Sequence, residues 1–391
     1  MTQLLIAGAG IGGLTTALTL HARGFDALVL ERAHDLQPLG VGINLLPHAV
    51  RELTALGLGD QLNAMAVAPS SIRFYSHRGD LLFTEPRGLA AGDAYPQLSV
   101  HRGRLQMMLL AAVRERLGDG AVRTGSGITG FRQRADGVVT ETTAGPVAGA
   151  ALIGADGINS VVRAELHPGS DPLLSSGITM YRGASDITPF LDGHTMAIIK
   201  ADNGVDLIAY PIGGGQVNWV LQVPTGQPGP LQGDAKWNAP ATANDVLPHV
   251  SGWDLDWLDI DALIGHSPAM FSYPMVDKDP LPHWGDGLVT LLGDAAHPMY
   301  PVGANGASQS IVDARVLADE LATHGVSGLR SYEQARRTET TDVIAANREM
   351  HVAGAARTST ELARVTTQYR TETATSTRSG PAVRGSAPAG R

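Results

Sequence analysis

Residues 4–13 read LLIAGAGIGG, an apolar run that passes directly into a glycine-rich turn. The stretch contains G-x-G-x-x-G at Gly8, Gly10 and Gly13, and the residues that follow, LTTALTLHARG, have helical spacing. A second apolar run, DALVLE, then ends at Glu31. A strand, a tight glycine turn, a helix and another strand in this order are typical of a dinucleotide-binding βαβ unit. The stretch therefore predicts an α/β fold built on a parallel sheet.

The three glycines have separate tasks in such a unit. Gly8 allows the tight turn, Gly10 lets the backbone approach a pyrophosphate, and Gly13 lets the helix pack closely on the sheet. The helix N-terminus supplies free N–H groups, and Glu31 would accept hydrogen bonds from an adenosine ribose. This acidic contact alone does not distinguish FAD from NAD. The same spacing recurs at 125–130, but a strand and a turn follow it, so we interpret that copy as a chance match.

The composition limits the chemistry that the chain can perform with its own side chains. Its 391 residues, 43% of them hydrophobic and 17% charged, suggest a globular protein of roughly two to three structural units. The absence of cysteine excludes thiol nucleophiles, disulfides, thiolate zinc sites and iron–sulfur clusters. No G-x-x-x-x-G-K motif occurs, so P-loop chemistry is not expected. Redox chemistry would need a bound cofactor.

The charge pattern argues against nucleic acid and membrane partners. The net charge is −9, and no basic patch with interleaved aromatic residues occurs before residue 357. The apolar run at 4–20 lacks a preceding basic side chain, so we interpret it as a buried strand and helix rather than a signal peptide. No uncharged apolar stretch of ~20 residues predicts a membrane span. We expect a cytoplasmic protein, and the sequence does not indicate its oligomeric state.

The order of helix-like and strand-like stretches along the chain predicts a discontinuous first domain. Helical spacing at 45–62 and 104–117 alternates with short apolar strands, and it returns from about 305 to 323. The β-branched and aromatic runs between 173 and 282, broken by Gly and Pro, instead predict an inserted antiparallel sheet. The expected division is a nucleotide-binding domain at 1–72, 98–172 and 283–325, a β-sheet domain at 73–97 and 173–282, a helical segment at 326–370 and a disordered tail at 371–391.

Two later segments carry a resemblance to a known family. LIGADGINSVVR at 152–163 and LGDAAHPMYPVGANG at 292–306 resemble the two further fingerprints of the group A flavoprotein monooxygenases, which are similar to para-hydroxybenzoate hydroxylase. The resemblance covers about residues 3–350. It implies a Rossmann-like FAD-binding domain, an inserted antiparallel β-sheet substrate domain and C-terminal helices. It also implies non-covalent FAD, NADH or NADPH as co-substrate, and molecular oxygen, with hydroxylation of a small aromatic substrate through a flavin C4a-hydroperoxide.

The resemblance also implies a set of cofactor-binding positions. Asp294 follows a buried strand and would accept a hydrogen bond from a ribityl hydroxyl, while the helix that opens after Gly303 would hold the pyrimidine end of the flavin. Arg102 is the expected phosphate contact. For Asp156 and Arg163, a structural ion pair remains an alternative to a role in the site. The full cofactor-binding prediction comprises Gly8, Gly10, Ile11, Gly12, Gly13, Leu14, Glu31, Arg32, Val41, Gly42, Ile43, Arg102, Ile128, Asp156, Gly293, Asp294, Gly303, Ala304, Asn305, Gly306 and Ala307.

The substrate region is defined less sharply by the sequence. The stretches VGIN at 41–44, EPRG at 85–88, AYPQ at 94–97, LDG at 191–193 and YPMVDKDPLPHW at 273–284 look most similar to phenazine hydroxylases, which act on methylated phenazine carboxylates. Side chains of the β region that could line an aromatic slot facing the flavin are Met180, Tyr181, Tyr210 and Trp219, although each is also compatible with ordinary core.

No residue is predicted to be catalytic with certainty. Pro301 would have a geometric role, because a rigid proline beside the reactive edge of the flavin holds neighbouring carbonyls and amides at fixed distance. We interpret His297 as a packing or hydrogen-bonding residue rather than a general base. A flavin reductase without oxygen insertion, or a flavin-binding sensor without turnover, would keep the same three fingerprints. Asn305 departs from the family pattern, in which many members place a second glycine there.

Overall fold

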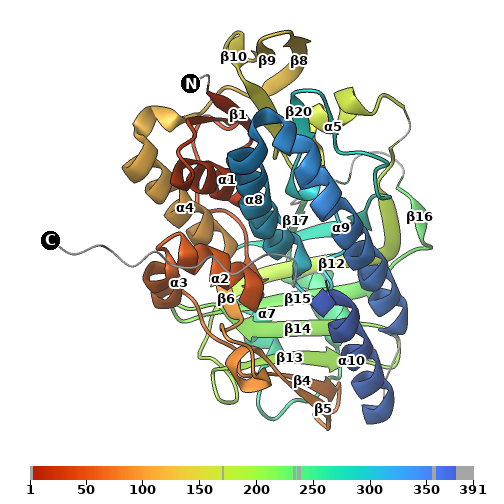
Figure 1. Ribbon diagram of the computed structural model, residues 1–391. Coiled ribbons are helices and arrows are strands. Elements are labelled where there is room, and N and C mark those ends of the chain that lie inside the picture. Colours follow the sequence, from red (N-terminus) through yellow and green to blue (C-terminus); the bar gives the residue numbers. More distant parts are fainter. Residues whose placement is uncertain (1–2, 170, 232–234, 236–238, 355–357, 376–391) are drawn as a thin grey trace, which may run out of the picture.

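The computed structural model describes residues 3–169, 171–231, 235, 239–354 and 358–375. Its first sheet has six strands in the order β19-β20-β11-β1-β2-β7 (Figure 1). The strand bounds are β1 Leu4–Ala7, β2 Ala27–Leu30, β7 Val122–Arg123, β11 Ala151–Gly154, β19 Gly285–Asp286 and β20 Val289–Leu291. All neighbours are parallel except β19 and β20. The predicted Rossmann-like sheet is therefore confirmed.

Three long helices pack around this sheet and against one another. They are α1 (Ile11–Ala22), α4 (Arg102–Leu117) and α8 (Asn305–His324), and α1 contacts both of the others. The expected helices at 104–117 and 305–323 are thus present. His101 caps α4, because its Nδ1 accepts from the backbone N–H groups of Gly103 and Arg104 at 3.1 and 3.4 Å.

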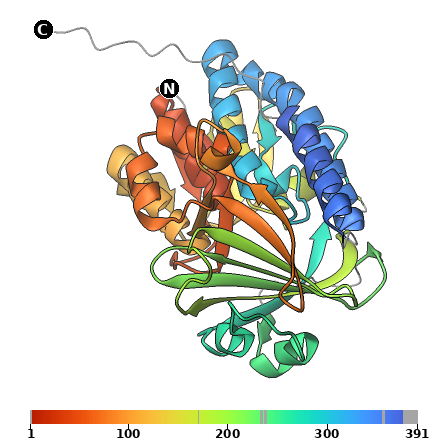
Figure 2. The same ribbon diagram turned by 90° about the horizontal axis from the view of Figure 1, so that it is seen from below.

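The second large sheet has nine strands and is mostly antiparallel. Its path is β17-β18-β12-β15-β14-β13-β4-β5, with β16 paired to β12 and a single parallel pairing between β13 and β4. The bounds are β4 Ser71–Ser76, β5 Leu81–Pro86, β12 Leu174–Asp186, β13 Thr195–Lys200, β14 Asp206–Pro211, β15 Gln216–Pro224, β16 Gly229–Pro230, β17 Ala239–Ala241 and β18 Met270–Asp277. In Figure 2 this sheet lies between the nucleotide-binding layer and two short helices, α6 (Ala243–Val246) and α7 (Ile260–Gly265).

Smaller elements join these layers. β3 (Gly42–Leu45) pairs with β6 (Leu98–His101) between the two large sheets, and α5 (Val161–Leu166) follows β11. The three-stranded sheet contains β8 Ile128–Arg134, β9 Gly137–Thr142 and β10 Val147–Gly149. Because the second G-x-G-x-x-G leads into β8 and not into a helix, it has no helix N-terminus to offer a phosphate.

Two local expectations need correction. The single helix expected at 45–62 is broken into α2 (Pro47–Ala55) and α3 (Gly59–Met65), because Gly57 has φ +74° and a helix cannot continue through a left-handed residue. At the other end, α9 (Gly328–Ala353) is followed by α10 (Ser359–Thr375). Residues 371–375, which were expected to be disordered, therefore belong to α10, and 376–391 lie outside the described residues. Within the described ranges, no helix has the length and apolar character needed to cross a bilayer.

Candidate active site

The glycine turn between β1 and α1 is closely packed on two sides and open on the third. A Cβ on Gly8, whose φ is +92°, would lie 2.7 Å from the Ala155 carbonyl oxygen, and a Cβ on Gly13 would overlap the carbonyl oxygen of Gly8. A Cβ on Gly10 would meet no atom within 4 Å. Gly8 and Gly13 are therefore required by packing, whereas Gly10 presents bare backbone to open space.

Glu31 stands beside this turn at the end of β2. Its Oε2 accepts from the Ala9 N–H and its Oε1 accepts from the Ala33 N–H, both at 2.7 Å. These bonds fix the carboxylate, and each oxygen keeps a lone pair for a ribose hydroxyl. Arg32 packs its stem against Gly127, where a Cβ would lie 3.0 Å from the Arg32 Cβ. Ile11 and Leu14 are buried core side chains, so they could approach a cofactor only through their backbone.

Arg102 and Asp294 lie close enough together for each to influence the pKa of the other, and we call their surroundings the recess. Both side chains are accessible to water. Burial nevertheless lowers the pKa of Arg102, with a further decrease from nearby Arg182, and burial raises the pKa of the Asp294 carboxyl. Water access combined with strong desolvation is typical of residues that line a deep opening. The expected phosphate contact and the expected ribityl contact are thus brought together.

The start of α8 forms one wall of this recess. Gly303 and Ala304 have left-handed backbone, with φ of +69° and +61°, and α8 then begins at Asn305. A Cβ on Gly306 would lie 3.7 Å from Asp294 Oδ1, so the first turn of the helix is next to that carboxylate. The helix is twenty residues long, and the free N–H groups of its first turn favour negative charge on a group that lies before it. Ala307 belongs to the same first turn.

A hydrogen-bonded cluster from the C-terminal helices holds the loop before α8. The Tyr369 hydroxyl of α10 donates to Asn347 Oδ1 at 2.6 Å and accepts from Asn305 Nδ2. Asn347 Nδ2, on α9, donates to the Tyr300 carbonyl oxygen at 3.3 Å. A Cβ on Gly303 would overlap Tyr369, so this glycine is needed for the contact. Sequence analysis did not single out Tyr369 or Asn347, because neither belongs to a local motif.

The nine-stranded sheet divides the predicted substrate residues between its two faces. Residues paired directly across neighbouring strands share a face, and Tyr210 pairs with Asn218 on β15. Asn218 Oδ1 accepts from the Gly42 N–H at 2.7 Å, so this face looks toward β3 and the nucleotide-binding layer. We call it the inner face and the opposite side the outer face. The inner face carries Met180, Arg182, Tyr210, Asn218 and Tyr273.

Tyr181 and Trp219 are on the outer face, which corrects the expectation that they line a slot facing the flavin. Trp219 is fully buried among the strands and helices α6 and α7. Its Nε1 donates to Ser267 Oγ at 2.7 Å and to Ser185 Oγ at 3.1 Å. Tyr181 stacks on His249, with 5.9 Å between ring centroids. The sheet itself separates both aromatic side chains from the recess.

Arg182 and Tyr273 are inner-face residues that the sequence analysis missed. The Arg182 guanidinium lies 4.2 Å from the centroid of the Tyr273 ring, in cation–π geometry. The Tyr210 hydroxyl is hydrogen-bonded to Asn44, and burial raises the pKa of Tyr210. A period of two from Met180 would have selected Arg182 instead of Tyr181. The inner face therefore offers aromatic rings and a cation within electrostatic range of Arg102.

The second fingerprint supports the site without forming the anticipated ion pair. Asp156 accepts from Ser160 Oγ at 2.5 Å and from the Val161 N–H at 2.8 Å, so it caps α5. Arg163 pairs with Asp171, not with Asp156, at 2.7 Å. Its Nη1 also donates to the carbonyl oxygens of Ala295 and Ala296 at 3.1 and 3.0 Å. Arg163 thereby holds the turn that follows Gly293 and Asp294.

The remaining predicted residues are distributed around this centre. His297 binds Asp313 at 2.6 Å in a buried cluster with Arg336, as expected for a structural histidine. Gly42 packs on Asn218, where a Cβ would lie 2.6 Å away. Val41 is buried, and Ile43 and Ile128 pack on the edge of the core around the six-stranded sheet. Gly12 packs on Leu292. Pro301 is exposed, next to Tyr300 in the chain.

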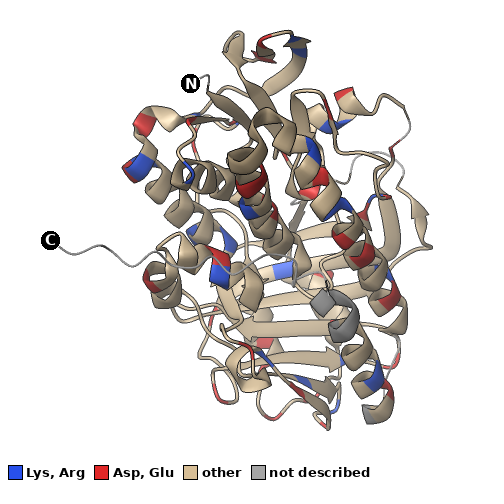
Figure 3. Cartoon of the chain, in the orientation of Figure 1, with Lys and Arg blue, Asp and Glu red and all other residues tan. Residues whose placement is uncertain are grey.

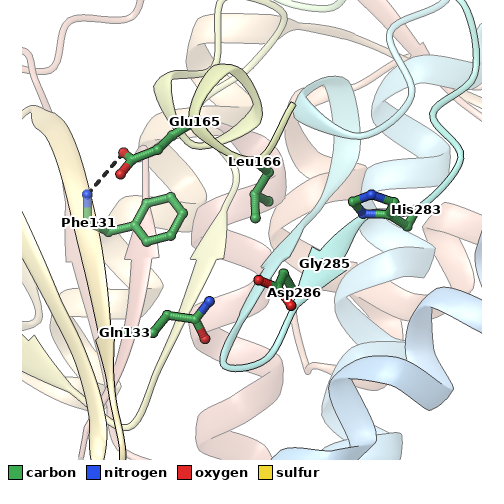
Figure 4. A pocket seen from close by; sticks show the side chains of 7 residues that line it. All are labelled: Phe131, Gln133, Glu165, Leu166, His283, Gly285 and Asp286. Atoms are coloured by element: carbon green, nitrogen blue, oxygen red, sulfur yellow. Dashed lines mark hydrogen bonds between the residues drawn. The ribbon is translucent and has the colours of Figure 1, made fainter. Parts of the chain in front are cut away.

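A cavity of the molecule lies away from this centre. It has a volume of ≈ 600 Å³ and is lined by residues of β8, α5 and the segment before β20, among them Glu165 and Asp286 (Figure 4). The Glu165 carboxylate accepts from the Phe131 N–H at 3.1 Å. No residue of the predicted cofactor or substrate site lines this cavity, so its size alone does not make it the active site.

Comparison with known proteins identifies the family. Residues 1–347 match the model of the FAD binding domain family. The chain belongs to that family. It is 47% identical to phenazine 1,6-dicarboxylic acid hydroxylase of Lysobacter antibioticus, over 94% of this chain and 96% of the relative. It is 35% identical to 3-hydroxybenzoate 6-hydroxylase 1 of Aquipseudomonas alcaligenes, over 87% and 86% of the two chains.

Solved structures share the same fold. HpxO of Klebsiella pneumoniae, complexed with FAD and uric acid, superposes with a TM-score of 0.79 at 22% identity and covers 97% of both chains. With its family and relatives, the chain is an FAD-dependent aromatic monooxygenase that uses NAD(P)H and oxygen. The bare backbone at Gly10 and the water-accessible Arg102 and Asp294 are compatible with FAD as the resident group.

Proposed function

We propose that the chain hydroxylates a phenazine or a similar fused aromatic compound that carries an acidic group. The observation that carries this proposal is the inner face, where Arg182, Tyr210 and Tyr273 converge near Arg102. Flat aromatic rings bind fused aromatic substrates through stacking and edge contacts, and a guanidinium in a desolvated setting favours an anionic substituent. The relative with 47% identity is named for a phenazine dicarboxylic acid, which supports the same substrate class.

The cofactor assignment is part of the proposal. Gly10 and the start of α1 would bind the pyrophosphate, Glu31 the adenosine ribose, Arg102 a phosphate oxygen and Asp294 the ribityl chain. When bound, FAD accepts a hydride from the nicotinamide donor and activates oxygen for transfer to the ring. The chain's own contribution is to orient the substrate and exclude water. Pro301 would keep the loop before α8 rigid beside the flavin.

The domain division and the setting of the enzyme also belong to the proposal. The six-stranded sheet takes strands from three separated stretches, whereas the nine-stranded sheet takes its strands from 71–86 and 174–277, which supports a discontinuous FAD-binding domain. Figure 3 shows residues of both charge signs distributed along α8 and α9, which supports the absence of a nucleic-acid partner. We place the enzyme in the cytoplasm on the basis of its composition.

The test is to purify the holoenzyme and follow NADH and NADPH oxidation with phenazine carboxylates and with simple phenols. A visible flavin spectrum, oxidation stimulated by a phenazine, and a product heavier by one oxygen atom are the expected results. Stimulated oxidation that releases only hydrogen peroxide would indicate a reductase. Binding that perturbs the flavin spectrum without turnover would indicate a sensor. Hydroxylation of phenols in preference to every phenazine would overturn the proposed substrate class.

A further inference from the structure

A second cavity adjoins the loop before α8, on the side of α2 and α10. Its volume is ≈ 300 Å³. It lies where the start of α2, the end of β5, the loop before α8 and helix α10 meet, and α10 packs on β5 (Figure 1). Gly303, Asn305 and Tyr369 form its wall toward the proposed flavin site. We call it the α2 cavity.

Two stretches that the sequence analysis singled out meet in this cavity. They are EPRG at 85–88 and AYPQ at 94–97, which contribute Pro86, Arg87, Gly88, Tyr95 and Gln97 to its lining. None of these residues belongs to the predicted cofactor site. Because they are two of the five stretches that resemble phenazine hydroxylases, their convergence on one cavity suggests a role in substrate recognition.

Arg87 is the most enclosed charged group of the α2 cavity. Its Nε donates to Gln97 Oε1 at 2.8 Å and its Nη1 donates to Glu85 Oε1 at 3.1 Å. Its Nη2 makes no hydrogen bond with another described residue. Its side chain is only 15% exposed, compared with 44% for Arg51, which also lines the cavity. Hydrogen bonds therefore hold Nε and Nη1 of the guanidinium in place, while Nη2 can donate to a carboxylate oxygen.

Two buried polar atoms of the cavity wall lack partners. His48 Nε2 and Asn305 Oδ1 have no hydrogen bond within the part of the chain that the structure describes. Burial, together with Arg336 and Arg51, lowers the pKa of His48 to about 3, so its imidazole is neutral and can donate from one ring nitrogen. His48 also lies in the first turn of α2, whose positive end favours an anion. Both atoms are therefore available to hydrogen-bond a group that enters the cavity.

Hydrogen bonds connect the α2 cavity to the inner face. Gln97 Nε2 donates to Asn44 Oδ1 at 3.2 Å, and Asn44 is in turn hydrogen-bonded to the Tyr210 hydroxyl. Asn44 Oδ1 also accepts from Ser99 Oγ at 2.6 Å. Arg87 is thus linked through Gln97 and Asn44 to a residue of the proposed aromatic site. These side chains therefore couple the position of Arg87 to that of Tyr210.

We propose that the α2 cavity is a carboxylate subsite, in which Arg87 and His48 bind the acidic substituent of the fused aromatic substrate. This inference rests on the proposed function, because it names the part of the chain that recognises the acid. Leu46, Pro47 and Tyr95 supply apolar surface for the ring that bears the carboxylate. Arg182 remains a separate cation on the inner face.

The experiment compares two probes on the holoenzyme, phenazine-1-carboxylate and its uncharged carboxamide. Their dissociation constants are measured from the change in flavin absorbance on titration. The native protein should bind the carboxylate at least 10-fold more tightly than the carboxamide. In R87Q the carboxylate should bind roughly 10- to 100-fold more weakly, because a charge-assisted hydrogen bond is lost, while binding of the carboxamide should change by less than about 3-fold.

Matched variants keep the test interpretable. Arg73, on neighbouring strand β4, pairs with Asp192 at 3.0 Å and does not line the cavity, so R73Q should leave both constants unchanged. If R87Q alone does not fold, the E85Q/R87Q pair removes the buried ion pair as a unit. Equal affinity of the native protein for the two probes, or an equal loss for both in the Arg87 variant, would overturn the subsite.

The outcomes also separate the subsite from the proposed function. Arg87-dependent binding of the carboxylate without any hydroxylated product would support the subsite and contradict phenazine hydroxylation. Hydroxylation of both probes, with equal affinity for the two, would support phenazine hydroxylation and contradict the subsite. If neither probe binds, both proposals are wrong.

Discussion

The two faces of the nine-stranded sheet differ in what covers them and in which side chains they present. The outer face carries Trp219, Leu207 and Leu221 and is closed by α6 and α7. The inner face carries Arg182, Tyr210 and Tyr273, and it is open to the recess that contains Arg102 and Asp294. One sheet therefore serves as a core on one side and as a binding surface on the other.

This difference shows how the strands can specify a fold and a site at the same time. Successive residues of a strand point to opposite faces, so Tyr181 and Arg182 are neighbours in sequence but lie on the outer and inner face, respectively. Substitutions on the outer face should change the free energy of unfolding, and substitutions on the inner face should change activity.

The largest effect is expected on the outer face, at Trp219. Replacing it with alanine removes a fully buried indole and should lower the free energy of unfolding by about 3–5 kcal/mol. The product yield and kcat of the fraction that retains FAD should stay within about 3-fold of the native values, because the sheet lies between this side chain and the recess. Urea unfolding midpoints and steady-state kinetics measure the two quantities. W219F, which keeps a ring, is the milder control, and a selective loss of kcat would contradict the separation of the faces.

A smaller effect, in activity instead of stability, is expected at Arg182. R182Q should lower kcat/KM for an acidic aromatic substrate roughly 10- to 100-fold, since a cation close to the substrate is lost. The free energy of unfolding should change by less than about 1 kcal/mol, because the lost cation–π contact with Tyr273 is offset by relief of the repulsion between Arg182 and Arg102. Steady-state kinetics and urea unfolding are compared with those of R73Q. Unchanged kcat/KM together with reduced stability would place Arg182 among the structural residues.

The parts of this arrangement that the sequence predicted are those encoded locally. The turn from Gly8 to Gly13 and the turn around Asp294 depend on a few consecutive residues, so their motifs were sufficient. The break at Gly57 is also local, but the continuous amphipathic pattern around it predicts a single helix. A glycine within an amphipathic pattern can end a helix, and periodicity alone does not reveal this.

The parts that the sequence did not predict depend on contacts between distant segments. The packing of β15 against β3 decides which alternate residues of β12 lie on the inner face. The sequence alone predicted Tyr181 for that face, whereas the structure places Arg182 there. An ion pair between Arg163 and Asp156 was one of two alternatives, but Asp171 supplies the carboxylate partner of Arg163. Tyr369 reaches the loop before α8 from a helix more than sixty residues later in the chain. No local pattern encodes such a contact.

The smallest effect is expected where the C-terminal helix meets the inner side of the molecule. Leu362 of α10 packs with Tyr210 and Ile212 of the inner face, and Tyr369 binds the loop before α8. In Y369F, Asn347 Oδ1 loses its hydrogen-bond donor and Asn305 Nδ2 loses its acceptor, while the ring that packs on Gly303 remains. The loop should then hold the flavin less firmly, and the hydrogen peroxide released per NAD(P)H oxidised should rise by about 3-fold, equivalent to ~0.7 kcal/mol. The flavin absorbance maximum and the reduction potential should shift as well, which a purely structural role for Tyr369 would not cause. A variant that loses thermal stability but keeps the native coupling, spectrum and potential would show that α10 only covers the inner face, as α6 and α7 cover the outer one.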